Sequence, residues 1–353
     1  MATAYSGSAT PDTDLVTDYL RLGLAFDRLE EGFVDAYTGD PALRAEVAGG
    51  PAPEPAALAD RARGLRSELP AGLTPDRAAF VDAHLRALEC SARKFAGESI
   101  GFVDEVRAYF DVDIAPADTD DYRKAHGELA SALGVPDATG PALSDAYATY
   151  RRADEIPPER VDECVRAFSG ALRERVRDVF PLADNEIVEF EVVTDKPWSG
   201  FNYYLGNYRS RVAINADLTQ YMSSLPHLIA HEAYPGHHTE HCRKEQILVG
   251  GGQTEQTIFL VNTPQCLMAE GLADHALHAA IGDNWGLWAQ EIYADLGLRF
   301  DGERAQRVGA AVEGYRLLGE WLEQVPQDAR LARFGRLLDE PLTPALLRAE
   351  LGQ

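Results

Sequence analysis

The chain has 353 residues, and its 57 acidic residues against 33 basic ones leave a formal net charge of −24 at pH 7. Such an acidic surface repels nucleic acids and anionic membranes, so we expect neither as a partner. No segment approaches the roughly 18 consecutive apolar residues that a membrane-spanning helix needs. The acidity is typical of a halophilic protein, because high salt screens the repulsion between carboxylates.

The N-terminal stretch and the cysteines indicate the compartment. The first residues, MATAYSGSATPDTD, lack the basic and apolar regions of a signal peptide. The four cysteines are scattered and form no CxxC pair, which argues against a disulfide framework or a cysteine-rich zinc site. These features predict a cytoplasmic protein with reduced thiols. They leave the oligomeric state open.

Residues 1–184 predict a helical region. The apolar residues between Leu15 and Phe26 recur at spacings of three and four, which places them on one helix face. Thr74 and Pro75 are typical of the N-cap and first residue of another helix. Breaks rich in proline and glycine separate the helical stretches. Further helices are expected at about 98–111, 119–134, 142–153 and 157–179.

The pattern changes near Asn185. The segment EIVEFEVVTD alternates like a strand, and GFNYYLGNYRSRVAINADL predicts two strands around a turn at Gly206 and Asn207. Long helices are expected afterwards at about 217–246, 254–281 and 285–323. The sequence therefore predicts a mainly α fold with a small antiparallel sheet. Its two regions, 1–184 and 185–353, are expected to form one compact unit with a cleft between them.

The segment LPHLIAHEAYPGHHTEHC, residues 225–242, holds five of the nine histidines. His231 and Glu232 open the pattern H-E-x-x-H, in which two histidines one helical turn apart bind zinc and the glutamate acts as general base. The position four residues after His231 is Pro235, however, which interrupts the helical hydrogen bonding. The second metal ligand must therefore come from beyond a bulge or kink.

Two histidines compete for that role. His237 would return to the expected place if a bulge absorbed two residues, and such insertions cluster at functional sites. His238 lies about 10 Å from His231 along a straight helix, a long span for one shared ion. The spacing favours His237 without excluding His238. His227 and His241 are expected to be surface residues or to support the ligands.

A third ligand is predicted further along the chain. Glu270 and Asp274 are four residues apart on a helical stretch, so they share one face. Glu270 suits the ligand role, and Asp274 suits a carboxylate that accepts the second ring proton of a zinc-binding histidine. Two histidines and one glutamate favour zinc, Zn²⁺, over other metals.

These motifs carry a family resemblance. HEAYPGHH, followed by AEGLAD, resembles the domain of unknown function 885 family, which is regarded as a family of zinc metallopeptidases. The family is distantly similar to helical metallocarboxypeptidases and to the thimet-oligopeptidase type. The resemblance is strongest over 197–282. It implies a multi-helix metallopeptidase-like fold with a small sheet beside the active-site helix, and functional roles for His231, Glu232, one of His237 and His238, and Glu270.

The predicted function is hydrolysis of peptide bonds, with a peptide or small amide as substrate and Glu232 as general base. A further donor to the oxyanion is expected from His238 or Tyr204, with Tyr203 and Tyr208 as other candidates. Arg209 and Arg211 are candidates for holding a substrate carboxylate. Two alternatives remain: a zinc hydrolase that cleaves other esters or amides, and a non-catalytic metal- or partner-binding protein derived from a peptidase.

Overall fold

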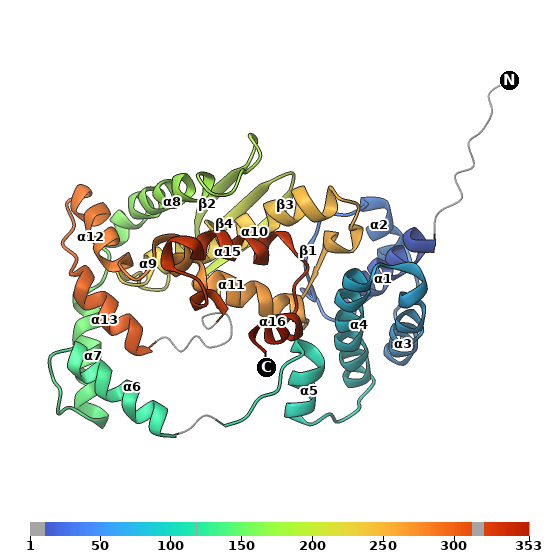
Figure 1. The fold of residues 1–353 in the computed structure, drawn as a ribbon, viewed down its shortest axis with the longest axis horizontal. Coiled ribbons are helices and arrows are strands. Elements are labelled where there is room, and N and C mark those ends of the chain that lie inside the picture. The colour runs from blue at the N-terminus through green and yellow to red at the C-terminus, as the bar shows by residue number, and fades with distance from the viewer. Residues whose placement is uncertain (1–10, 117–118, 313–320, 353) are drawn as a thin grey trace. The chain divides into compact units, whose positions relative to one another are not determined.

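The computed structural model describes residues 11–116, 119–312 and 321–352. It is mostly helical, as predicted, with two small sheets (Figure 1). Contacts divide the described chain into two compact units instead of one. Unit 1 comprises the described parts of 1–114, 244–268 and 339–353, and unit 2 those of 115–243 and 269–338.

This division differs from the predicted regions 1–184 and 185–353. Helix α6 (Thr119–Ala132) packs against α13 (Gly302–Val312), so a segment expected in the N-terminal region belongs to unit 2. Strand β5 (Ile258–Leu260) pairs with β1 (Val34–Tyr37), which brings a later segment into unit 1. Pairing between residues distant in sequence leaves no periodic signal, and sequence patterns alone therefore missed it.

Unit 1 is built around an apolar core. Helix α1 (Pro11–Phe26) buries Tyr19 and Phe26 beside α3 (Pro55–Gly72), which packs on α4 (Pro75–Phe95). Burial of these aromatic side chains stabilises the unit through the hydrophobic effect. The remaining elements are α2 (Pro41–Gly49), α5 (Phe102–Phe110), a π-helix (Glu245–Val249), a 3₁₀ turn (Thr254–Thr257) and α16 (Pro344–Leu351).

Unit 2 contains a three-stranded sheet in the order β2-β4-β3. Strands β3 (Gly200–Gly206) and β4 (Arg209–Asn215) form the predicted hairpin, and Asn207 takes the positive φ that its turn requires. Strand β2 (Ile187–Val193) pairs with β4 in parallel, so the sheet is mixed instead of purely antiparallel. Parallel pairing is possible because β3 lies between the two in sequence and provides the crossover.

The helices of unit 2 are shorter than predicted. The segment 217–246 contains two separate helices, α9 (Leu225–Glu232) and α10 (His237–Lys244), and the segment 285–323 contains α12 (Trp285–Asp295) before α13. Helix α11 (Pro264–Ile281) begins later than expected because β5 occupies the preceding residues. The other elements are α7 (Gly140–Ala153), a 3₁₀ turn (Pro158–Arg160), α8 (Val161–Arg177) and α15 (Gln327–Asp339).

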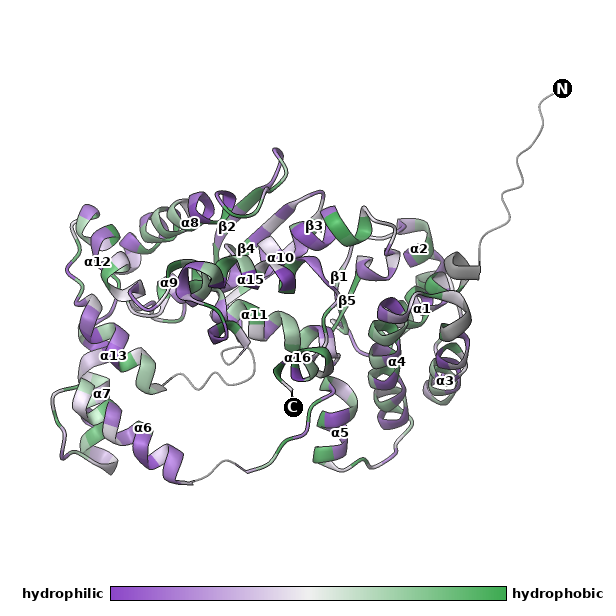
Figure 2. Ribbon diagram, viewed as in Figure 1, coloured by the Kyte–Doolittle hydropathy of each residue, from purple (hydrophilic) through white to green (hydrophobic). Residues whose placement is uncertain are grey.

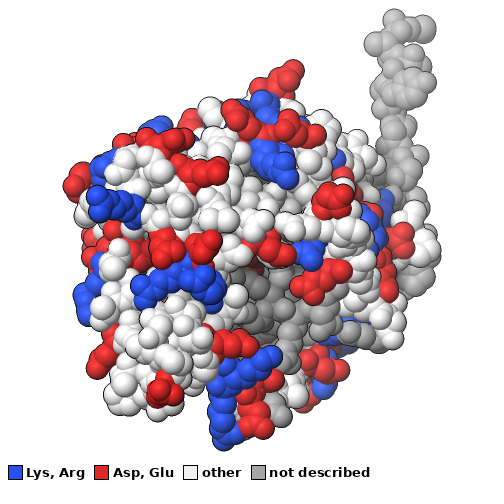
Figure 3. Space-filling view, turned by 60° about the vertical axis from the view of Figure 1, so that its left-hand side comes forward, with Lys and Arg blue, Asp and Glu red and all other residues white. Residues whose placement is uncertain are grey.

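The surface helices are amphipathic, with alternating polar and apolar positions along their ribbons (Figure 2). On the face shown in Figure 3, acidic and basic side chains are intermixed. Ion pairs such as Arg166 Nε and Asp162 Oδ2, which are 2.8 Å apart, neutralise charge locally. Among the helices that the structure describes, none is both long and apolar enough to cross a membrane.

Candidate metal centre

The turn between α9 and α10 decides where the histidines lie. Helix α9 ends at Glu232, the Tyr234–Pro235 peptide bond is cis, and α10 starts at His237. The Gly236 N–H donates to the carbonyl of Ala230 at 2.9 Å. A Cβ atom on Gly236 would lie 1.8 Å from the His231 carbonyl oxygen, so only glycine allows this close approach.

The turn brings His237 back beside His231, with ring centroids 4.7 Å apart. One ligand atom from each of His231, His237 and Glu270 lies within 4.8 Å of the other two. The Nε2 atom of each histidine is 3.5 Å from one oxygen of Glu270, which projects from α11. The structure therefore brings the three predicted metal ligands together, with His237 instead of His238 beside His231.

The outward-facing nitrogens of these two histidines also lie near carboxylates. His231 Nδ1 is 3.1 Å from Asp274 Oδ1, and His237 Nδ1 is 3.8 Å from Glu240 Oε2. The 3.1 Å contact is a hydrogen bond that fixes the His231 ring so that Nε2 carries the free lone pair, as is typical of metal-binding histidines, whereas 3.8 Å is beyond hydrogen-bonding distance. The predicted contact between Asp274 and a ligand histidine is therefore present.

The charges of the cluster suit a cation. Burial alone would lower the pKa of His231, but hydrogen bonds to Asp274 and Glu270 outweigh burial and raise that pKa to about 10. Burial would raise the pKa of Glu270, but its contacts with His231 and His237 lower it. The carboxylates thus favour positive charge at this point. Two imidazole nitrogens and one carboxylate are a donor set that fits zinc.

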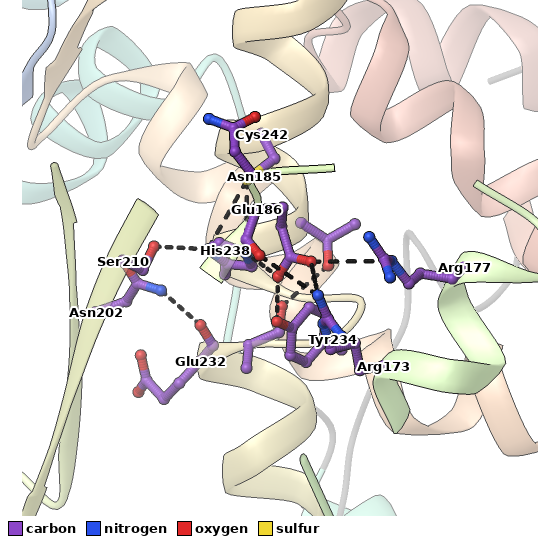
Figure 4. Close-up of polar contacts among 12 residues, drawn as sticks. Arg173, Arg177, Asn185, Glu186, Asn202, Ser210, Glu232, Tyr234, His238 and Cys242 are labelled. Carbon is purple, nitrogen blue, oxygen red and sulfur yellow. Dashed lines mark hydrogen bonds and ion pairs between the residues drawn. The ribbon is translucent and has the colours of Figure 1, made fainter. Parts of the chain in front are cut away.

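Glu232 lies beside the cluster in a cavity of about 840 Å³ that His231 and Asp274 also line. Its backbone carbonyl accepts a hydrogen bond from Asn202 Nδ2 at 2.7 Å, which ties α9 to β3 (Figure 4). A Cβ atom on Gly200 would lie 3.2 Å from Glu232 Oε1, so the carboxylate packs against the strand. Burial raises the pKa of Glu232, although His237 and His231 oppose this, and a raised pKa suits a group that accepts a proton.

His238 does not join this cluster. Its fully buried ring lies 2.8 Å from Ser210 Oγ through Nδ1 and 2.9 Å from Glu186 Oε1 through Nε2 (Figure 4). The Tyr234 hydroxyl donates to the same Glu186 oxygen. Both nitrogens of His238 are engaged away from the metal ligands, so this position does not support the predicted catalytic role.

Glu186 is the centre of this second network. Arg173 donates to Glu186 Oε2 from Nε at 3.0 Å and from Nη2 at 2.8 Å (Figure 4). Burial alone would raise the pKa of Glu186, but the hydrogen bonds from His238, Tyr234 and Arg173 lower it to about 2. Burial lowers the pKa of His238. The network therefore consists of a neutral imidazole and an ionised carboxylate. The carboxylate of Glu186 holds Tyr234 before the Pro235–Gly236 turn and His238 after it. Sequence analysis assigned Glu186 only to the start of a strand.

The other sequence candidates have different surroundings. Tyr204 stacks on His241, with centroids 4.6 Å apart, instead of lining the cavity that Glu232 faces. Tyr203 packs under the Arg211 guanidinium at 4.8 Å. Arg209 and Arg211 pair with Glu189 and Glu191 of the neighbouring strand, both at 3.2 Å. None of these contacts places a side chain at the candidate metal centre.

Comparisons with known proteins leave the family open. No family model matches the chain, and no curated protein matches it. Among solved structures, the chain is similar to a "putative lipoprotein" from Colwellia psychrerythraea, with 14% sequence identity and a TM-score of 0.44. The similarity covers 84% of this chain and 66% of that chain.

Proposed function

We propose that the protein is a zinc-dependent metallopeptidase. The observation that carries this proposal is the convergence of His231, His237 and Glu270 within 4.8 Å of one another, with Glu232 lining the adjoining cavity. A purely structural metal site has no use for a general base at that position. The resemblance of the HEAYPGHH and AEGLAD segments to the domain of unknown function 885 family supports the same activity.

In this proposal, His231, His237 and Glu270 hold the zinc ion, and Asp274 orients His231. A bound zinc ion would polarise the scissile carbonyl and make a water molecule easier to deprotonate. Glu232 accepts a proton from the attacking water, whose oxygen bonds to the carbonyl carbon. The C–N bond breaks, and Glu232 returns the proton to the leaving amine. The products are a carboxylic acid and an amine.

The substrate is proposed to be a short peptide, and the location is proposed to be the cytoplasm. The scattered cysteines, which form no CxxC pair, support that location. A cavity of about 840 Å³ is of the size that encloses a small molecule or a few peptide residues. An ester or another amide would undergo the same chemistry, so peptides and esters should be tested side by side.

The decisive experiment combines metal content with turnover. The full chain, purified at high salt without chelator or histidine tag, should contain about one zinc per molecule by mass spectrometry. The Glu232→Gln variant should retain the metal and lose peptide hydrolysis by about 10²- to 10⁴-fold, the usual contribution of a general base. Unchanged turnover in Glu232→Gln, or protein that takes up no zinc, would refute the proposal.

A further inference from the structure

The cavity beside the candidate metal centre also contains a basic side chain. Arg151, on α7, is the one lysine or arginine among the described residues that line this cavity. Its described lining also contains the carboxylates Asp217, Glu232 and Asp274 and the imidazoles His227 and His231. The guanidinium is the one group in this lining that can bind a carboxylate through two parallel hydrogen bonds.

Arg151 is held in place by groups that leave much of its hydrogen-bonding capacity unused. Its Nη1 donates to Ser223 Oγ at 3.3 Å and to Ser224 Oγ at 3.1 Å, and its Cζ lies 3.4 Å from the centroid of the Tyr221 ring. In the described part of the chain, every hydrogen bond of this guanidinium runs through Nη1. Arginine has five N–H donors, so Nε and Nη2 can still bind a carboxylate.

The Asp154 carboxylate does not occupy those donors. Asp154 Oδ2 is 3.9 Å from Arg151 Nη1, beyond hydrogen-bonding distance. That oxygen instead accepts hydrogen bonds from the backbone N–H and the hydroxyl of Ser223. Asp154 thus helps to hold the serine that positions Arg151, while the guanidinium is available for an external anion.

We propose that Arg151 binds the terminal carboxylate of a peptide substrate, and that the protein removes short fragments from the carboxyl end of peptides. This inference rests on the proposed peptidase function. Ser224 and His231 are seven residues apart at the two ends of α9, which corresponds to about 10 Å along the helix. An extended peptide advances about 3.3–3.6 Å per residue. The separation along the helix therefore corresponds to about three residues of extended peptide between the scissile bond and the carboxylate end.

A binding experiment tests this inference separately from turnover. The probe is a library of N-acetylated tripeptides, each made with a free carboxyl end and as the amide, and titrated by calorimetry into the zinc-loaded Glu232→Gln protein. We expect the free acids to bind about 10- to 100-fold more tightly than the amides, the effect of a charge-assisted hydrogen bond. An amide that carries an internal glutamate distinguishes a side-chain carboxylate from a terminal one, and we expect it to bind as weakly as the other amides.

Two further variants locate the effect. Arg151→Gln in the same background should abolish the preference for free acids, and Arg151→Lys should retain part of it. Arg152→Gln is the matched control, because Arg152 is the next residue of α7 and is exposed. Equal affinity for acids and amides, no binding of any acid, or a preference that survives Arg151→Gln would overturn the inference. Equal affinity for acids and amides, and the lack of binding of any acid, are both measured without an Arg151 variant. The inference can therefore be refuted even if the Arg151 variants misfold. Loss of turnover in wild type with an intact acid preference would refute only the peptidase function.

Discussion

His237 and His238 are neighbours in sequence, yet they belong to two different sites. His237 lies beside His231, which lines the cavity, and the Nε2 atom of each ring is 3.5 Å from an oxygen of Glu270. His238 is completely buried, and both of its nitrogens have close partners within 3 Å. The start of one helix thus contributes to a candidate metal site through His237 and to a buried polar network through His238.

The two clusters also differ in their electrostatic balance. Around Glu186, arginine, tyrosine and histidine donors satisfy the carboxylate, which is typical of a buried group that stabilises a fold. Around Glu270, the Nε2 atoms of His231 and His237 each lie 3.5 Å from a carboxylate oxygen, a distance longer than that of an ordinary hydrogen bond. That spacing leaves room for a shared cation, so the first cluster is complete without a ligand and the second is suited to one.

Substituting the two histidines separately should give the largest contrast. His237→Ala removes a proposed metal ligand, so zinc binding should be lost, and peptide hydrolysis should fall by at least about 10³-fold if zinc activates the water as proposed. The thermal midpoint of the zinc-free protein should change little. His238→Ala should instead lower that midpoint and leave zinc stoichiometry near one in the folded fraction. Reversed effects in the two variants would contradict the assignment of the two rings.

Removing the Glu186 carboxylate should have the next largest effect. Glu186→Ala leaves Arg173, His238 and Tyr234 without their common acceptor in a buried position. Breaking a buried charged network of this kind costs about 3–5 kcal/mol of unfolding free energy. Urea unfolding of the zinc-free protein measures this loss of unfolding free energy. Glu189→Ala, an exposed carboxylate on β2, is the control and should cost less than about 1 kcal/mol. Equal losses in both variants would show that Glu186 is not a centre of stability.

The dependence of the free energy of unfolding on pH is a second test of the Glu186 network. Against the effect of burial, hydrogen bonds from His238, Tyr234 and Arg173 lower the pKa of Glu186 in the folded protein to about 2, from about 4.5 for an exposed glutamate. Because the folded state binds this proton less readily, Glu186 contributes stability above about pH 4.5, and this contribution is lost as the pH falls towards 2. A carboxyl pKa lowered to this extent contributes about 3 kcal/mol to the free energy of unfolding. The free energy of unfolding should therefore fall less steeply with acid in Glu186→Gln than in wild type. Parallel curves for the two proteins would contradict this.

The smallest expected effect concerns Asp274. Asp274→Asn keeps the size of the side chain but removes the charge beside His231 Nδ1. Loss of such a supporting carboxylate typically weakens metal binding by about 10- to 100-fold. Competition with a chromophoric zinc chelator measures the affinity. The exposed Asp283 is a control, because it contacts His278 and no candidate ligand. Asp283→Asn should leave zinc affinity unchanged, and an equal loss in both variants would indicate a general charge effect.

Several features of the protein follow from short-range sequence patterns. Helical periodicity predicted the mainly α fold, and β-branched alternation with Gly206 and Asn207 predicted the hairpin of β3 and β4. The spacing of Glu270 and Asp274 predicted that both would face one side of α11, and both contact His231. These predictions succeed because periodicity and turn propensity act over a few residues.

The choice between His237 and His238 depended on the tertiary structure. The sequence required a break at Pro235 but could not determine which ring the break would return to His231. Glu186, 52 residues before His238, engages one ring and leaves the other beside Glu270. The parallel pairing of β2 and the position of Arg151 in the cavity were likewise decided by the tertiary structure. Each depends on contacts between residues far apart in the chain, whose energies come from burial and hydrogen bonding and leave no local pattern.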